Sequence, residues 1–115
     1  MTLILRYAAS PGIEALPEVA LARWRIVRLP DGGCHLVGFR TDTDRPKGRF
    51  STRLEGFDPV GMAGVTSSGR VYRLVGPSGD GPDTQLVRDG WLVTCGLRPD
   101  EATDVTPADA ARPLN

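Results

Sequence analysis

The stretch from residue 30 to residue 69, PDGGCHLVGFRTDTDRPKGRFSTRLEGFDPVGMAGVTSSG, decides the fold. Three turn signals divide it: Pro30-Asp31-Gly32-Gly33, Asp58-Pro59-Val60-Gly61 and Ser67-Ser68-Gly69. Each contains residues that adopt tight-turn dihedral angles at low steric cost, and the runs between them are rich in β-branched and aromatic residues. The pattern predicts a mainly β domain built as an antiparallel meander.

Working outward, the alternation of apolar and polar residues predicts strands at 20–29, 34–41, 49–57, 62–67 and 70–75, with a weaker strand at 2–8. The polar segment 41–48 contains Pro46 and is expected to be a mobile loop. Five or six short strands should form a strongly bent sheet or a small barrel, because closure removes exposed strand edges. Trp24 and Tyr72 share parity with apolar neighbours and are expected in the core.

The segment 83–95 fits two structures. Asp83 can cap a helix, and Asp89-Gly90 between two apolar runs also fits a two-residue hairpin turn. We favour the helix, which would make the fold α+β, although Gly90 costs about 1 kcal/mol inside it. The buried stripe of that helix is expected to comprise Leu86, Val87, Gly90, Trp91 and Thr94.

The length of 115 residues suits one domain. We expect this domain to cover residues 1–97. Residues 98–115 (RPDEATDVTPADAARPLN) contain four acids, three prolines and no aromatic residue, so they are expected to form a flexible acidic tail.

Charge argues against the simplest nucleic-acid protein, because 14 basic side chains balance 14 acidic ones. The basic side chains nevertheless gather between residues 20 and 73, and all but Lys47 are arginines. Strand parity predicts that Arg49, Arg53 and Arg73 face solvent on neighbouring strands. The candidate partner-binding residues are Arg40, Arg49, Ser51, Arg53, Arg70 and Arg73.

Recognisable catalytic chemistry is missing from the sequence. Cys34 and His35 are adjacent on a predicted strand, so their side chains should point to opposite faces and cannot easily share a metal or act as nucleophile and base. The glycine-rich segment 76–82 lacks the Lys-Ser/Thr ending of a phosphate-binding loop. We therefore expect no cofactor, no metal and no catalytic residues, and interpret Cys34 and Cys95 as packing residues. The first residues do not fit an export signal, so a cytoplasmic protein with reduced thiols is expected.

Several short segments between residues 24 and 76 carry a resemblance. They are Trp24-Arg25-Ile26-Val27-Arg28-Leu29, His35-Leu36-Val37-Gly38, Arg49-Phe50-Ser51-Thr52, Phe57-Asp58-Pro59 and the run TSSGRVYRL from Thr66 to Leu74. Together they resemble small β-rich proteins of proteobacterial mobile genetic elements. The resemblance implies accessory work for a plasmid, phage or integrative element, and it implies no catalytic residues. Such elements also carry inhibitors of host defence, including anti-CRISPR proteins, which act by occupying a partner's surface.

These observations predict a non-enzymatic accessory protein that binds a macromolecule, most simply through protein–protein contacts. The alternative is a small nucleic-acid-binding β-barrel that uses the arginine-bearing sheet face. A small enzyme without a recognisable motif is a third class. The expected partner is a protein in preference to a nucleic acid, without a membrane or a small-molecule cofactor, and the sequence leaves the oligomeric state open.

Overall fold

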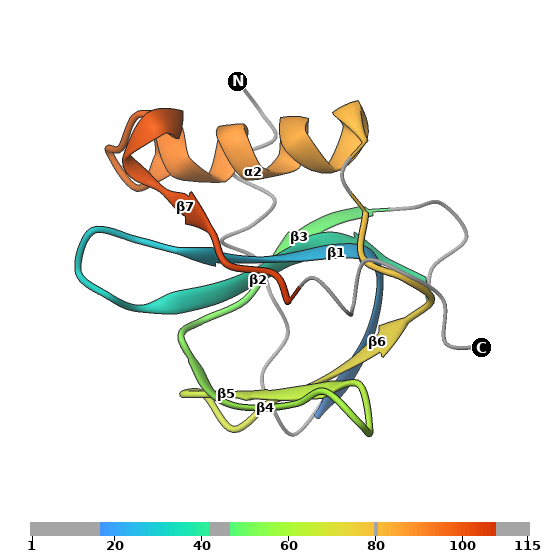
Figure 1. The fold of residues 1–115 in the computed structure, drawn as a ribbon. Helices are drawn as coiled ribbons and strands as arrows, with labels where there is room; N and C mark the ends of the chain where they lie inside the picture. Colours follow the sequence, from blue (N-terminus) through green and yellow to red (C-terminus); the bar gives the residue numbers. More distant parts are fainter. Residues whose placement is uncertain (1–16, 42–46, 80, 108–115) are drawn as a thin grey trace.

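The computed structural model describes residues 17–41, 47–79 and 81–107, and shows a bent sheet with one helix packed over it (Figure 1). The predicted strand at 2–8 and most of the predicted loop at 41–48 lie outside these residues. The elements are β1 (Glu18–Arg28), β2 (Cys34–Arg40), β3 (Lys47–Phe50), β4 (Leu54–Asp58), β5 (Ala63–Thr66), β6 (Val71–Val75), α2 (Pro82–Thr94), a 3₁₀ turn η1 (Pro99–Glu101) and β7 (Thr103–Asp104).

The strands form one mixed sheet in the order β3-β2-β1-β6-β5-β4, with β7 paired to β1. Most neighbours are antiparallel, but β1 and β6 run parallel from Glu18 opposite Val71 to Ala22 opposite Val75. The prediction of a mainly β fold is confirmed. The prediction of a purely antiparallel meander is wrong, and the sheet does not close into a barrel. Turn signals report only on strands adjacent in sequence, so they carried no information about the pairing of β1 with β6.

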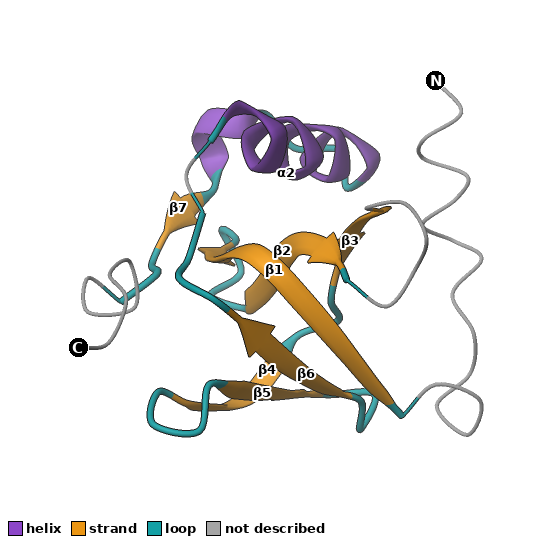
Figure 2. Cartoon of the chain, turned by 90° about the vertical axis from the view of Figure 1, so that its right-hand side faces the viewer, coloured by secondary structure: helices purple, strands orange, loops and turns teal. Residues whose placement is uncertain are grey.

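Strand β1 joins two halves of the sheet by bending in its middle. The register with β2 shifts between Ala22 and Arg25, and Arg23 adopts φ of +50°, a left-handed conformation typical of a bulge. Before the bend β1 pairs with β6, and after it β1 pairs with β7, while β2 lies along its other edge. The two halves therefore face each other across a core, as Figure 2 shows.

Two hydrophobic clusters occupy the two faces of β1 and β2. The first cluster lies between the sheet halves and contains Val19, Leu21, Trp24, Ile26, Leu36, Tyr72 and Leu74. The second lies beneath α2 and contains Val27, Val37, Val87, Trp91 and Leu92. Trp24 is 0% and Tyr72 2% exposed, which confirms their predicted burial. Both faces of β1 and β2 are thus covered by hydrophobic packing. These strands therefore do not have one apolar face and one polar face that is open to solvent.

The predicted turns after β1 and β5 are present. In the first, the amide of Gly32 donates to the carbonyl of Leu29, and the amide of Leu29 donates to the carbonyl of Gly33. In the second, the amide of Gly69 donates to the carbonyl of Thr66. Gly32 and Gly69 have φ of +89° and +88°, where a side chain would be strained, so glycine is required for both hairpins.

The predicted strand at 49–57 is two strands, β3 and β4, separated by residues 51–53. The amide of Ser51 still donates to the carbonyl of Leu36, so the pairing with β2 extends one residue beyond β3. The chain then crosses to the other half of the sheet, where Leu54 pairs with Thr66. The apolar alternation continues through this crossing, which is why one strand was predicted.

Segment 83–95 is helical, as favoured, but its start and its buried face differ from the prediction. Gly81 is the N-cap, and Asp83 lies in the first turn. The buried residues are Thr84, Val87, Trp91 and Leu92, whereas Leu86 is 69% exposed. The helix turns this face inward because Trp91 packs on Phe50 and His35, with ring centroids 5.2 and 5.1 Å away.

Residues 98–107 are not a solvated tail. After η1, Thr103 and Asp104 pair with Arg28 and Val27 of β1, and the amide of Val105 donates to the carbonyl of Ile26. Val105 also packs against the first cluster. The acidic composition of the segment did not predict this contact, because only a few of its side chains make the contact. Residues 108–115 lie outside the described residues.

Candidate functional site

The arginines expected to form one recognition face lie in different environments. Arg49 and Arg70 are 7% and 6% exposed, whereas Arg53 and Arg73 are exposed and Arg40 is half-buried. Strands β3 and β6, which carry Arg49 and Arg73, are separated by β2 and β1. The structure therefore does not bring these side chains together on one surface.

Arg49 is a structural residue. Its Nε donates to the Tyr72 hydroxyl over 3.2 Å, and its guanidinium carbon lies 5.8 Å from the centre of the Tyr72 ring. The neighbouring Phe50 packs beneath α2, so strand alternation turns Arg49 to the opposite side, toward Tyr72. The predicted outward orientation of Arg49 is wrong because the side of β3 that was assumed to be open faces the other half of the sheet, which contributes Tyr72.

Ser51 is also structural and is only 2% exposed. Its hydroxyl accepts a hydrogen bond from the buried amide of Leu36 at 2.8 Å and donates to the carbonyl of Thr52 at 2.6 Å. The side chain thereby replaces a strand partner where the chain leaves β3. Ser51 is not accessible to a macromolecular partner in this arrangement.

Arg73 is exposed, but its charge is already neutralised within the chain. Its Nε and Nη2 donate to the two carboxylate oxygens of Glu18 at 3.1 and 3.0 Å. These hydrogen bonds and the opposite charge lower the pKa of Glu18 and raise the pKa of Arg73. This ion pair links the parallel strands β1 and β6 on their solvent-facing side. The guanidinium of Arg73 is therefore occupied by a residue of its own chain.

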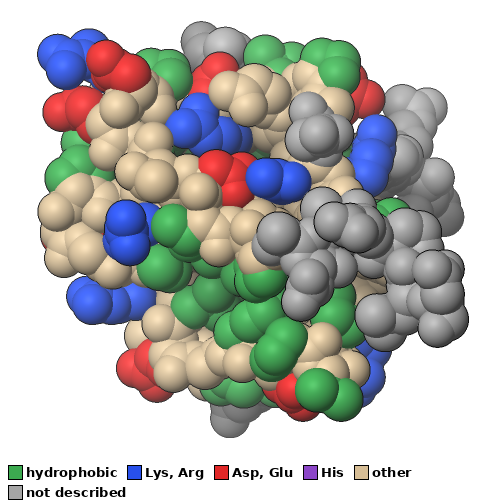
Figure 3. Space-filling model, in the orientation of Figure 1, with side chains coloured by type: hydrophobic (Ala, Val, Ile, Leu, Met, Phe, Trp, Pro, Cys, Tyr) green, Lys and Arg blue, Asp and Glu red, His purple; other side chains and the backbone are tan. Residues whose placement is uncertain are grey.

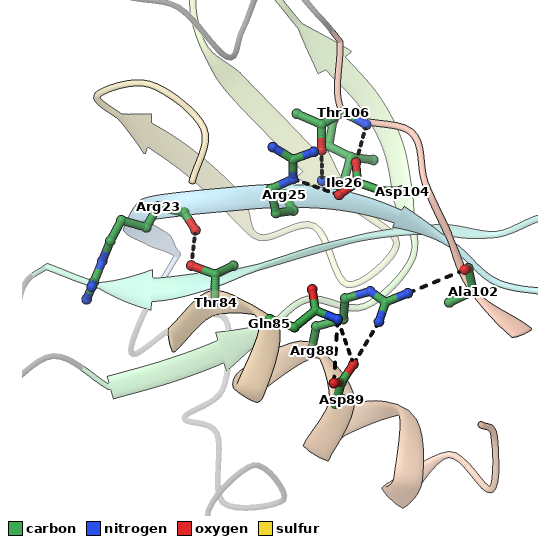
Figure 4. Close-up of polar contacts among 10 residues, drawn as sticks. All are labelled: Arg23, Arg25, Ile26, Thr84, Gln85, Arg88, Asp89, Ala102, Asp104 and Thr106. Atoms are coloured by element: carbon green, nitrogen blue, oxygen red, sulfur yellow. Dashed lines mark hydrogen bonds and ion pairs between the residues drawn. The ribbon is translucent and has the colours of Figure 1, made fainter. Parts of the chain in front are cut away.

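A polar joint connects β1, α2 and the C-terminal segment (Figure 4). It borders a partly open hollow of about 40 Å³, enough for a few water molecules and too small for a nucleotide. The joint is lined by Arg25, Gly79, Thr84, Gln85, Arg88 and Asp104. Arg88 connects α2 with the C-terminal segment. It pairs with Asp89 of the same helix at 2.7 Å and donates to the carbonyl of Pro99 in η1 at 3.0 Å.

Asp104 is the anchor of the C-terminal segment in this joint. Its Oδ2 lies 2.7 Å from Nε of Arg25, and its Oδ1 accepts from the amide of Thr106 at 2.9 Å. Partial burial raises the pKa of the Asp104 carboxyl, but the hydrogen bonds with Arg25 and Thr106 outweigh that effect and hold the pKa below its ordinary value. The arginines of the joint are thus paired with aspartates, and its main effect is to fasten the C-terminal segment to β1.

An apolar surface remains where the two halves of the sheet spread apart. Figure 3 shows it as a continuous, hollowed hydrophobic area between the β1–β2 layer and the β4–β5 hairpin. The partly buried hydrophobic residues packed against the first cluster come from the elements around this area, and we call them the apolar opening: Cys34, Leu54, Phe57, Met62 and Val105. The sequence analysis did not identify these residues as a site, because strands far apart in the sequence contribute them.

Two features of the β4–β5 hairpin distinguish this edge of the opening. Met62 adopts φ of +53°, which is uncommon for a residue with a side chain and costs conformational energy. Strand β4 is at the end of the sheet order, so in the part of the chain that the structure describes no strand pairs with its outer edge. Backbone amides and carbonyls on such an edge are able to pair with another strand.

The histidine and the two cysteines, all within the part of the chain that the structure describes, lie in separate surroundings. His35 places Nδ1 3.0 Å from the carbonyl oxygen of Ser51. Cys34 is half-buried in the opening, as expected for a packing residue, but Cys95 is exposed, contrary to the prediction. Among residues 17–41, 47–79 and 81–107, no three His, Cys, Asp or Glu side chains are grouped so that they could hold a metal ion.

None of the helices described has the length and apolar character needed to cross a membrane. Comparisons of the chain with protein-family models, with curated proteins and with solved structures found no match.

Proposed function

We propose that this chain is a non-enzymatic binding protein whose partner is another protein, and that the partner is held at the apolar opening. The observation that carries the proposal is the coincidence of this surface with the outer edge of β4, with which none of the described strands pairs. Burial of apolar side chains drives most protein association, and a strand edge supplies directional hydrogen bonds beside it.

The positions of the cations favour a protein partner over the nucleic-acid alternative. Arg49 and Arg70 are buried, and Arg73 is bound to Glu18. Affinity for a phosphate backbone depends on several accessible cations that are free to displace counterions. The exposed cations Lys47 of β3, Arg53 in the link between β3 and β4, and Arg28 at the end of β1 belong to different segments, which is a weak basis for such binding.

We propose that the partner contributes an extended segment that adds to β4. Leu54 and Phe57 of this strand both belong to the apolar opening although they are three residues apart, because the register of β4 shifts between Leu54 and Gly56. In a strand, alternate side chains point to the same face, so a segment paired with β4 would direct every second side chain toward the opening. An apolar residue at those positions would bury Phe57 and Met62 further.

The resemblance of residues 24–76 supports a biological setting for this proposal. A small accessory protein of a mobile element would act on a protein of the host or of the element itself. Occupation of a partner's surface, including a host defence protein, requires no catalytic residue.

Two cysteines make the proposed contact testable without changing the protein. Cys34 belongs to the apolar opening, and the exposed Cys95 follows α2, so Cys95 serves as an internal control. A protein identified by co-purification from the native host is added, and alkylation of each cysteine by a small reagent is followed by mass spectrometry. The proposal predicts slower alkylation of Cys34 and an unchanged rate at Cys95.

A matched pair of variants supplies the second test. Met62→Lys introduces a charge into the opening, and Val65→Lys introduces the same charge at a valine of β5 that is 43% exposed and outside the opening. Partner binding should be lost in Met62→Lys and kept in Val65→Lys, with both variants folded by circular dichroism. Equal binding by the two variants, or unchanged alkylation of Cys34 in the complex, would exclude the opening as the contact.

A further inference from the structure

Strand β4, at the end of the sheet order, has an apolar side and an acidic side. Phe57 pairs with Gly64, and Gly64 pairs with Tyr72 of the first cluster, so Phe57 faces inward. The next residue, Asp58, points to the opposite side of the strand and is exposed. Glu55, at the shift of register, is exposed as well. In Figure 3, acidic side chains border the hydrophobic area at its lower edge, where the β4–β5 hairpin lies.

The carboxylates of Glu55 and Asp58 form no ion pair within residues 17–41, 47–79 and 81–107. Exposed carboxylates elsewhere do form such pairs, as with Glu18 on β1 and Asp83 on α2. Arg53 directly precedes β4, but its side chain lies against the turn between β1 and β2. The outer edge of β4 thus carries two negative charges that no cation of the described residues neutralises.

A second copy of this chain does not suit this edge. Charged side chains and irregular register on an edge strand hinder its pairing with an identical edge. If the β4 strands of two copies paired antiparallel about an axis between Gly56 and Phe57, Glu55 of each copy would lie opposite Asp58 of the other. Like charges directly opposite each other destabilise a sheet, whereas opposite charges stabilise it. The edge therefore favours a strand with positive side chains.

We propose that the outer edge of β4 binds an extended basic segment in which apolar and positively charged residues alternate. This inference rests on the proposed function and adds the chemistry of the partner. In an added strand, the residue beside Phe57 faces the apolar opening and the residue beside Asp58 faces outward. An apolar side chain at the first position buries Phe57 further, and a lysine or arginine at the second pairs with the carboxylate.

The two carboxylates act mainly on the choice of partner. A pair of opposite charges on adjacent strands strengthens binding by about 1.5-fold to 5-fold, and a pair of like charges weakens it by a similar factor. Replacement of the basic residues of the segment by acidic ones should therefore weaken binding about tenfold.

Three synthetic peptides with the same N-terminal dye and an amidated C-terminus test the proposal by fluorescence anisotropy with the full chain. KVKVKVK has the proposed charge and alternation, EVEVEVE reverses the charge, and KKVVVKK keeps the composition of the first peptide without the alternation. KVKVKVK should bind about tenfold more tightly than EVEVEVE, and more tightly than KKVVVKK. It should also slow the alkylation of Cys34 and leave that of Cys95 unchanged, because only Cys34 belongs to the apolar opening.

Matched variants locate the contact on the protein. Glu55→Gln and Asp58→Asn remove the two charges, and asparagine is still able to accept the amide of Val60, as Asp58 does at 2.9 Å. Asp31→Asn is the control, since Asp31 accepts the amide of Gly33 at 2.8 Å in the same manner but lies in the turn between β1 and β2. The double variant should bind KVKVKVK about fivefold more weakly than the wild type, and Asp31→Asn should bind it equally well. All variants should keep the wild-type circular dichroism.

The inference is overturned if KVKVKVK binds no more tightly than either of the other peptides, if none of the three binds, or if the double variant binds KVKVKVK like the wild type. The apolar opening itself is tested separately, by Met62→Lys and by alkylation in the presence of the co-purified partner. If that partner protects Cys34 equally in the wild type and in the double variant, the opening is the contact and the basic segment is wrong.

Discussion

The Ser51→Ala variant tests whether Ser51 is a structural residue, as its contacts indicate, or an accessible binding residue. The hydroxyl accepts the amide of Leu36 at 2.8 Å, and Leu36 itself is 0% exposed. Alanine removes the acceptor and leaves the amide without a partner in a place that water reaches poorly. The carbonyl of Thr52 also loses a donor, but Thr52 is exposed and its carbonyl can bind water.

The expected loss of stability follows from the buried amide. A buried donor left without a partner costs about 1–3 kcal/mol, so we expect the free energy of unfolding to fall by about 2 kcal/mol. For a domain of this size, each 1 kcal/mol lowers the melting temperature by about 4 °C. The variant should therefore melt about 8 °C below the wild type.

Urea unfolding followed by tryptophan fluorescence and thermal unfolding followed by circular dichroism measure these changes. Ser67→Ala is the matched control, because Ser67 is exposed and its change should alter stability by less than about 0.5 kcal/mol. If Ser51→Ala unfolded with the same free energy as Ser67→Ala, the inference that this hydroxyl satisfies the Leu36 amide would be refuted.

Two further predictions concern charged side chains. Arg49→Glu should fail to fold, because a buried carboxylate without a cation costs about 3–5 kcal/mol. Arg53→Glu, at an exposed site, should fold normally. The soluble yield and the circular dichroism of the two variants check this prediction. Asp104→Asn should lower stability at neutral pH by up to about 1 kcal/mol, because it weakens the pairing with Arg25. Since the pKa of Asp104 is lowered in the folded chain, its contribution is present above the ordinary value of 3.8 and disappears as the pH falls through the lowered pKa. Urea unfolding should thus show the difference between Asp104→Asn and the wild type shrinking in acid, and a constant difference would contradict the role of this ion pair.

Local sequence signals predicted the local parts of the fold. Gly32 and Gly69 mark the hairpins because a left-handed backbone favours glycine at both positions. The burial of Trp24 and Tyr72 followed from their parity with apolar neighbours. These inferences depend on residues close together in the chain.

The site residues could not be predicted in the same way, because their environment depends on distant segments. Strand parity placed Arg49 opposite Phe50, as in the structure, but the side that carries Arg49 faces Tyr72 of the other sheet half and not solvent. The apolar opening combines residues from β2, β4 and the segment after β7, which approach one another only in the folded chain. The docking of residues 103–106 depends on the short pairing of β7 with β1, one ion pair, two hydrogen bonds to Ile26 and the packing of Val105, and so few contacts leave little trace in the composition of the segment.

The pairing of β1 with both β6 and β7 has a consequence for how the chain folds during synthesis. Glu18 pairs with a residue more than 50 positions later, and Val27 pairs with one more than 70 positions later. Such distant pairings are slow to form, and β1 leaves the ribosome before β6 and β7. One edge of β1 must therefore remain uncovered until the residues of β6 and β7 have been synthesised. Any prematurely terminated product that ends before Thr103 would expose backbone beside Ile26 and Val27. Such fragments should aggregate or be degraded, so synthesis through Val105 is a condition for the survival of this domain.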